Sequence, residues 1–343
     1  MTIESVTDES KGDGVVETFR LWSDEVEKMR PEARAAIEAG RATLPIGEMA
    51  DAQMTRDEQV AQQRASLAAV TFPLPETEER DLGGVRCRVS LPDGPARGVY
   101  LHFHGGGMIA GTPELMDIPN HELAREFGVV VVSADYRKAP EHPWPAGPDD
   151  GVAVARWLLA HAKSEFECER LLIGGESAGA YMAAVVGLRV RDELHSITRV
   201  AGLNLTFGIY DWGRSPSQRG VRPQDGFDLL SPSASTFVAE CFLPGKTDDE
   251  RRAPEISPAF ADLRGLPPCF VSVGTCDHLV DDSLLFASRA SAAGVDVELF
   301  VAPEMPHGFQ IFDCGITKLW ARHQSAWFRS HVAGRSANAR FGP

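Results

Sequence analysis

Short apolar runs alternate with helical patterns along most of the chain. The consecutive valines of Val129–Ala134 are typical of a strand with both faces buried. Strands of this kind are predicted at Gly98–His104, Val129–Ala134, Arg170–Gly175, Ile197–Thr206, Pro268–Gly274 and Val295–Val301. Helices are predicted between and after them, at Glu114–Phe127, Gly151–Lys163, Ser177–Val190, Asp281–Ala293 and Ile316–Ser330. This alternation predicts an α/β fold with a mostly parallel sheet covered by helices on both faces.

The start of the chain has a different pattern. Residues 15–75 are mostly helical, with one apolar helix face and a second helix at Arg56–Ala69. The apolar residues of that face, which recur at steps of four and three, are Val15, Phe19, Trp22, Val26 and Met29. These helices precede the first strand and cannot be crossovers within the sheet, so they are either a structural brace or part of a lid. A hairpin turning at Gly83-Gly84 then opens the first part of the core, residues 76–206.

A second irregular segment follows the strand that ends at Thr206. Residues 207–255 are rich in Gly, Pro, Ser and aromatic residues, with one clear helix near Ser231–Phe242. A structureless loop of this length is uncommon in a compact domain, so we interpret the segment as an insertion that carries lid structure. The second part of the core is predicted at 256–333, and loose tails are predicted at 1–14 and 334–343.

Charge and cysteine usage limit the possible partners. The chain has 343 residues with 34 basic and 49 acidic side chains, a formal net charge of −15, which argues against nucleic acids and anionic membranes. Its opening is polar and acidic, unlike a signal peptide, and no apolar run approaches the roughly 20 residues that span a bilayer. The six cysteines lack metal-ligand spacing, so we expect reduced thiols in a cytoplasmic protein.

The clearest chemical motif is Gly175-Glu-Ser-Ala-Gly179. It follows a predicted apolar strand and precedes a helix of small residues. In this context Gly-x-Ser-x-Gly places the serine on a sharp strand-to-helix turn with its hydroxyl exposed. The flanking glycines allow the turn without a side-chain clash. Ser177 is therefore the predicted nucleophile.

A serine hydroxyl is a weak nucleophile near neutral pH and needs a base that is itself oriented by an acid. His307 follows the last predicted strand, where a loop would bring it over the carboxyl edge of the sheet. Asp277 follows the preceding strand. Its rivals Asp281 and Asp282 look like the first turn of the next helix, where acidic side chains suit the helix dipole. We predict His307 as the base and Asp277 as its partner.

A glycine-rich loop lies upstream, at Gly105–Gly107. Its backbone N–H groups, with that of Ala178, are the expected donors to an oxyanion. His102 and His104 precede it as a His-x-His pair, but no third ligand follows at suitable spacing, so no metal site is expected there. His104 is expected to shape the glycine loop.

Together these segments resemble the bacterial hormone-sensitive-lipase-like carboxylesterases of the α/β-hydrolase superfamily, over about residues 95–310. The most specific segments are His104-Gly-Gly-Gly-Met108, Asp135–Ala146, Gly174–Gly179, Ser257–Pro268 and Ala293–Phe309. Two positions depart from the family's usual pattern. Glu176 stands where Asp is most common, and Ala180 stands where Gly is most common.

The resemblance implies an α/β-hydrolase fold with a mostly parallel, eight-stranded sheet and a helical cap made by residues 15–75 and 207–255. It implies that Ser177, Asp277 and His307 form a catalytic triad. It also implies that Gly106 and Gly107 donate to the oxyanion with Ala178. No cofactor and no metal are expected.

The predicted activity is hydrolysis of small to medium apolar carboxylic esters through an acyl-enzyme. A lactone or an amide is the alternative substrate for the same residues, and a non-catalytic ligand receptor is the alternative from a different class. Related receptors lose the base, which this chain keeps. The expected partner is a small-molecule ester, and a homodimer is possible.

Aromatic residues in the two irregular segments suggest where the substrate binds. The candidates for an apolar pocket above Ser177 are Met108, Phe19, Trp22, Tyr210 and Trp212. The alternative is that these side chains only pack the cap against the sheet.

Overall fold

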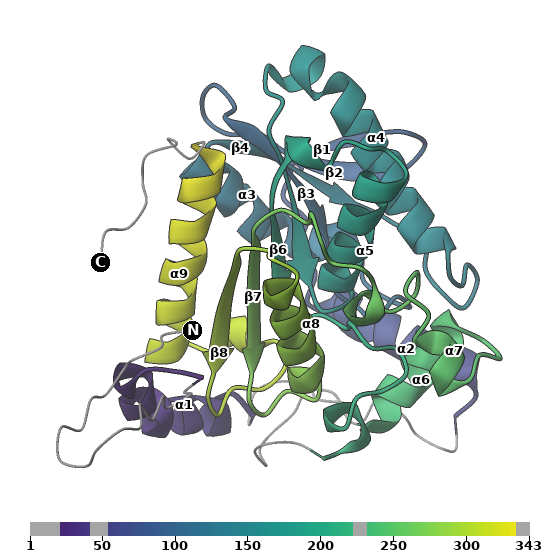
Figure 1. The fold of residues 1–343 in the computed structure, drawn as a ribbon, viewed down its shortest axis with the longest axis vertical. Coiled ribbons are helices and arrows are strands. Elements are labelled where there is room, and N and C mark those ends of the chain that lie inside the picture. The colour runs from purple at the N-terminus through teal and green to yellow at the C-terminus, as the bar shows by residue number, and fades with distance from the viewer. Residues whose placement is uncertain (1–20, 42–53, 222–231, 334–343) are drawn as a thin grey trace, which may run out of the picture.

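A single twisted sheet forms the centre of the molecule (Figure 1). The computed structural model describes residues 21–41, 54–221 and 232–333, so the tails predicted at 1–14 and 334–343 lie outside the described residues. Within that part of the chain, eight strands are ordered β1-β2-β4-β3-β5-β6-β7-β8. The strands are β1 (Glu78–Asp81), β2 (Arg86–Ser90), β3 (Gly98–Phe103), β4 (Val129–Ala134), β5 (Leu171–Glu176), β6 (Val200–Thr206), β7 (Cys269–Gly274) and β8 (Val297–Ala302).

The sheet is antiparallel only at its N-terminal edge. Strand β2 pairs antiparallel with β1 and with β4, and all pairs from β4 to β8 are parallel. The hairpin between β1 and β2 turns at Gly83 and Gly84, which both have positive φ, as predicted. Because the strands from β3 to β8 run in the same direction, the loops that follow them meet at one edge. The predicted α/β fold with a mostly parallel sheet is confirmed.

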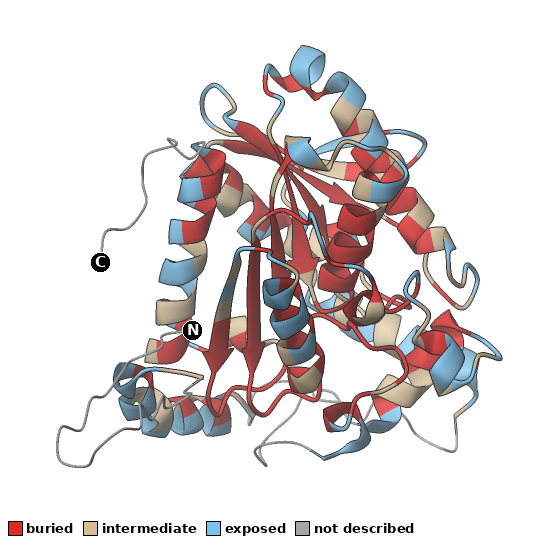
Figure 2. Cartoon of the chain, in the orientation of Figure 1, coloured by how far each residue is buried: buried red, intermediate tan, exposed pale blue. Residues whose placement is uncertain are grey.

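Helices cover both faces of the sheet, and each face has its own apolar cluster. One cluster unites residues of α4 (Ala146–Phe166), α5 (Ala178–Asp192) and α8 (Val280–Ala292). The other unites α3 (Asp117–Phe127) with α9 (Gly315–Val332). The central strands are buried, and the exposed residues lie on the outer sides of the helices (Figure 2). Both faces of β3 and β4 are therefore removed from water, which explains their continuous apolar sequence.

Two helices precede the sheet. Helix α1 (Asp24–Arg41) lies beside α9, and its Ala33 and Ile37 belong to the α3–α9 cluster (Figure 1). Helix α2 (Arg56–Ala69) begins with a capping box between Thr55 and Glu58, and its Val60 belongs to the other cluster. The two helices thus join different sides of the core.

Several predicted boundaries need correction. Helix α1 starts at Asp24, so Trp22 lies before it; the Ser23 hydroxyl accepts from the Val26 N–H, and acidic residues fill the first turn, a common helix start. Helix α4 starts at Ala146 rather than Gly151, since Pro148 is tolerated in a first turn. The segment after β6 holds α6 (Pro232–Phe242), as predicted, and also the short α7 (Asp248–Arg251). No described helix is long and apolar enough to cross a bilayer.

Candidate active site

Ser177 lies at the turn between β5 and α5. Its φ of 57° and ψ of −119° are strained for a residue with a side chain, and the turn requires the glycines that flank it. A Cβ on Gly175 would lie 2.1 Å from the backbone oxygen of Phe103, and one on Gly179 would lie 1.8 Å from it. The Gly-x-Ser-x-Gly pattern therefore reflects close packing of this turn against the end of β3.

His307 and Asp277 come to Ser177 from two neighbouring loops. The His307 Nε2 lies 2.9 Å from the Ser177 Oγ, and the His307 Nδ1 lies 2.9 Å from the Asp277 Oδ2. All three residues are buried, with Asp277 completely removed from solvent. The structure thus brings the three predicted residues together in the order serine, imidazole and carboxylate. This order suits proton transfer from the hydroxyl to the imidazole.

The Asp277 carboxylate is held in its ionised form. Burial opposes ionisation, but the charge of His307, its hydrogen bond and the His278 Nδ1 at 3.4 Å lower the pKa of Asp277 below its usual range. Its Oδ1 also accepts from the Leu279 backbone N–H at 2.8 Å. An ionised Asp277 keeps the proton of His307 on Nδ1, which leaves Nε2 free to accept the serine proton.

The glycine loop lies next to Ser177. Gly106 and Gly107 have φ of 125° and 63°, and a Cβ on Gly106 would lie 2.2 Å from the Ala110 backbone oxygen. None of the described residues accepts a hydrogen bond from the N–H of either glycine. Ala178 is the first residue of α5, where N–H groups have no partner within the helix. These three predicted donors are therefore available to an oxygen beside Ser177.

His104 contacts the glycine loop and supports it. Its Nδ1 lies 2.7 Å from the Gly105 backbone oxygen, and its ring stacks on Tyr136 at 4.4 Å. Burial, with the nearby charge of Lys138, lowers the pKa of His104 to about 3, so the ring is neutral near pH 7. This agrees with the expectation that His104 shapes the loop.

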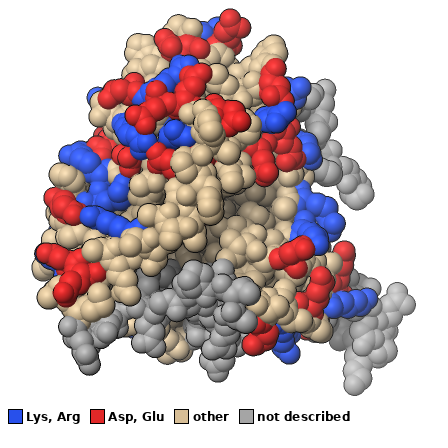
Figure 3. All heavy atoms as spheres, turned by 180° about the vertical axis from the view of Figure 1, so that it is seen from behind, with Lys and Arg blue, Asp and Glu red and all other residues tan. Residues whose placement is uncertain are grey.

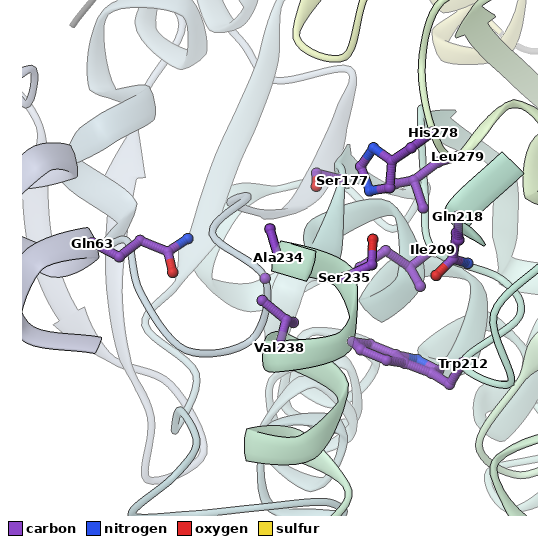
Figure 4. Close-up of a pocket in the computed structure, with 11 residues that line it drawn as sticks. Gln63, Ser177, Ile209, Trp212, Gln218, Ala234, Ser235, Val238, His278 and Leu279 are labelled. Carbon is purple, nitrogen blue, oxygen red and sulfur yellow. The ribbon is translucent and has the colours of Figure 1, made fainter. Parts of the chain in front are cut away.

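A small pocket opens beside Ser177, with a volume of about 40 Å³ (Figure 4). Apolar and polar side chains share its wall. The lining residues are Gln63, Gly107, Ser177, Ile209, Trp212, Gln218, Ala234, Ser235, Val238, His278 and Leu279. They come from α2, the glycine loop, the segment after β6, α6 and the loop after β7. The pocket is therefore assembled from segments far apart in the sequence.

The predicted pocket residues differ in where they lie. Trp212 lines the pocket, and Phe19 lies outside the described residues. Three others are not among the residues that line it. Met108 is fully buried, and its Cε lies 2.9 Å from the position that a Cβ on Gly147 would take. Tyr210 stacks on Phe286 of α8 at 4.6 Å.

Trp22 is the third. Its Nε1 donates to Glu27 of α1 at 2.7 Å. Apolar character alone did not distinguish pocket residues from packing residues.

Most pocket residues were not predicted from the sequence. His278 had a usable sequence signal, since it follows Asp277 directly. In the structure its ring lies 5.5 Å from that of His307. Gln63 and Ser235 had none, because each lies in an ordinary helical pattern. Their place in the pocket depends on how α2 and α6 pack.

Three potential metal ligands lie close together, namely Asp277, His278 and His307. However, the 2.9 Å bond between His307 and Asp277 occupies the Nδ1 of His307, and its Nε2 faces Ser177. A cation held by His307 would replace one of these two hydrogen bonds. The arrangement suits proton transfer better than metal binding.

Known proteins share both the sequence and the architecture. A family model described as the alpha/beta hydrolase fold matches residues 100–311. Carboxylesterase NlhH of Mycobacterium tuberculosis is 34% identical over 221 residues, which cover 62% of this chain and 67% of that protein. The acetyl esterase of Salmonella schwarzengrund is 29% identical over 229 residues, covering 66% of this chain and 70% of that protein.

Solved structures agree with these relatives. A hormone-sensitive lipase from a metagenome library superposes with a TM-score of 0.71 at 30% identity, covering 88% of this chain and 98% of that chain. The metagenomic carboxylesterase EstE1 superposes with a TM-score of 0.71 at 28% identity, covering 82% of this chain and 99% of its own. The chain therefore belongs to the hormone-sensitive-lipase-like carboxylesterases of the α/β-hydrolase fold.

Proposed function

We propose that this protein cleaves carboxylic esters with Ser177 as nucleophile, His307 as general base and acid, and Asp277 as the residue that orients His307. The observation that carries the proposal is the pair of 2.9 Å contacts that link Ser177, His307 and Asp277 beside an open pocket. The names of the relatives, carboxylesterase and acetyl esterase, support the same activity.

The reaction follows from this geometry. The Ser177 Oγ attacks the ester carbonyl while its proton passes to the Nε2 of His307. The carbonyl oxygen becomes an anion held by the N–H groups of Gly106, Gly107 and Ala178, where each donor contributes about 3 kcal/mol. His307 then gives the proton to the departing alkoxide. In the second half a water molecule attacks the acyl-enzyme, with His307 again taking and returning the proton.

Ser177→Ala tests the assignment. The variant removes the nucleophile without removing core volume, and kcat should fall by about a millionfold. A fluorophosphonate probe should label the natural protein and leave the variant unlabelled. Near-normal hydrolysis of p-nitrophenyl acetate by the folded variant would show that Ser177 is not the nucleophile.

We further propose that the ester has a compact apolar group on the side that enters the pocket. A volume of about 40 Å³ holds about three water-sized groups, comparable to a short acyl chain. Ile209, Trp212 and Val238 supply apolar walls for it. The face in Figure 3 carries acidic and basic side chains side by side, so the charge of −15 is not gathered there into one patch. Substrate choice is therefore proposed to depend on the pocket wall.

The measurement is kcat/KM for p-nitrophenyl esters of increasing acyl length. We expect the value to fall beyond about four carbons, because each further methylene needs room that the pocket lacks. Val238→Ala should move the optimum to longer chains. A profile that keeps rising with length, in both proteins, would rule out this pocket as the acyl site.

Location and assembly are also proposed. The six cysteines are free and buried, which supports the reduced thiols of a cytoplasmic protein. Cell fractionation tests the location. A homodimer stays a prediction, which light scattering after size-exclusion chromatography tests.

A further inference from the structure

Glu304 occupies an unusual place in the loop that carries His307. It lies three residues before His307, has a φ of 68°, and its side chain is only 6% exposed. A residue with a side chain adopts this left-handed conformation at a cost and keeps it only where its surroundings fix it. The contacts of Glu304 show what fixes it.

Backbone hydrogen bonds at Glu304 and Met305 join the loop that carries His307 (the base loop) to the loop that carries Asp277 (the acid loop). The Glu304 N–H donates to the Thr275 Oγ1 at 2.9 Å, two residues before Asp277. The Cys276 N–H donates to the Met305 backbone oxygen at 3.0 Å, so the two loops hold each other at consecutive positions. The distance between His307 and Asp277 therefore depends on the conformation at Glu304 and Met305.

The Glu304 side chain ties the same loop to α1. Arg30 Nε donates to the Glu304 Oε1 at 2.8 Å, and Arg34 Nη2 donates to the same oxygen at 2.6 Å. A buried carboxylate is stable only when it is paired, and a guanidinium keeps its charge at all relevant pH values. Both arginines lie about 270 residues away in the sequence, so this contact exists only in the folded protein.

Helix α1 is otherwise fixed to α9. Ala33 and Ile37 pack in the α3–α9 cluster, which also holds Met305 and Phe309 on either side of His307. Glu32 accepts from the Gly315 N–H at 3.1 Å, at the start of α9. The helix is therefore placed firmly enough to position the loop that it contacts.

We propose that α1 is a brace for the general base, in which Arg30 and Arg34 position His307 through Glu304. These three are positioning residues, since none of them lines the pocket beside Ser177. The proposal rests on the proposed esterase function and adds to it the element that holds His307 at 2.9 Å from both of its partners.

Glu304→Gln and the double variant Arg30→Ala/Arg34→Ala test the brace in the full-length protein. Misplacing a catalytic group by about 1 Å can cost up to a hundredfold, so we expect a loss of about tenfold in kcat for each variant. The KM for p-nitrophenyl acetate should change less than about twofold, because the pocket wall is untouched. Combining all three changes should cost little more than Glu304→Gln alone, since the arginines act through that carboxylate.

Two further variants separate positioning from general stability. Lys28→Ala changes an exposed residue of α1 that makes neither of the bonds to Glu304, and it should keep the natural kcat. Arg30→Lys/Arg34→Lys keeps both charges and should recover most of the activity. Circular dichroism and thermal unfolding confirm that each variant is folded at the assay temperature.

Unchanged kcat in folded Glu304→Gln and Arg30→Ala/Arg34→Ala would overturn the brace, as would an equal loss in Lys28→Ala. Failure of the esterase proposal is a different result. In that case the natural protein neither hydrolyses p-nitrophenyl acetate nor reacts with a fluorophosphonate, and the brace has no reaction to serve.

Discussion

Helices α1 and α2 share a sequence pattern but contact different parts of the molecule. Both precede the sheet, and both were assigned to one predicted cap. In the structure α1 joins the apolar cluster of α3 and α9, whereas α2 joins the cluster of α4, α5 and α8. Two helices that are adjacent in the chain thus join apolar clusters on opposite faces of the sheet.

In each helix, arginine side chains contact a loop that lies beside Ser177. Helix α1 reaches Glu304 in the His307 loop. Arg64 of α2 donates to the backbone oxygens of Ile109 and Ala139, at 2.9 and 3.2 Å, and pairs with Glu141. Ile109 lies two residues after Gly107. The loop that carries His307 and the glycine loop are therefore each supported by a different helix.

The helices differ in their relation to the substrate. Gln63 of α2 points toward the pocket from the side opposite Trp212, while no described residue of α1 lines it (Figure 4). Of the two readings of the N-terminal segment, brace and lid, we propose the brace for α1 and both roles for α2. The difference shows that a helix gains its role from the loop it contacts.

Among the changes that test this comparison, we expect the largest effect from Gly106→Ala, in the glycine loop that α2 supports. In Gly106→Ala the new Cβ would lie 2.2 Å from the Ala110 backbone oxygen, so the loop must move and its donors must shift. We expect kcat to fall by about a hundredfold or more, as for loss of an oxyanion donor. Gly84→Ala is the control, because Gly84 also has positive φ but open space around it, far from the site. Equal losses in both variants would show that strain alone is responsible.

The next effect concerns stability in acid, on the α2 side of the site. Because burial lowers the pKa of His104 to about 3, the folded protein leaves this ring neutral where the unfolded chain, with its ordinary pKa of 6.5, gains a proton. Protonation then favours unfolding, and the stability linked to His104 is lost as pH falls below about 6.5. At about pH 5 the loss is about 2 kcal/mol.

His104→Asn removes this titration while keeping a donor for the Gly105 oxygen. The free energy of unfolding, measured with urea at about pH 7 and about pH 5, should therefore fall less in the variant by about 2 kcal/mol. The same pH dependence in both proteins would mean that His104 becomes protonated in the folded state.

Arg64→Ala should have a smaller effect, a loss of about tenfold in kcat, because the oxyanion loop loses a support but keeps its own hydrogen bonds. Arg64→Lys retains the charge and one donor and should lose less. Steady-state kinetics below the unfolding temperature gives the measurement. An unchanged kcat in Arg64→Ala would show that α2, unlike α1, does not support a loop that the reaction needs.

The smallest expected effect distinguishes a helix that lines the pocket, α2, from a helix that only supports a loop, α1. Gln63→Ala should raise KM by about two- to fivefold and alter the preference among p-nitrophenyl esters, with kcat nearly unchanged, because one wall contact is lost. Glu32→Ala of α1 should leave both KM and this preference unchanged. If both variants alter ester preference equally, α1 also contributes to the pocket.

The residues that we propose to carry the reaction could be predicted because their signals are local. The glycines around Ser177 are required because a Cβ at either position would lie within 2.1 Å of the Phe103 backbone oxygen. Asp277 and His307 each follow a strand, and parallel strands bring such loops to one edge. Helix α4, by contrast, begins five residues earlier than predicted, since its first turn carries little apolar signal.

The sequence by itself determined the α/β fold class with its mostly parallel sheet, and the turn that carries Ser177, because these depend on periodicity and on backbone conformations that only glycine adopts easily. Tertiary structure alone decided which side chains face the substrate. Met108 and Tyr210 are as apolar as Trp212, yet they pack against Gly147 and Phe286. Likewise, nothing in the sequence links Arg30 to Glu304. Such contacts depend on how distant elements pack, which one-dimensional patterns do not record.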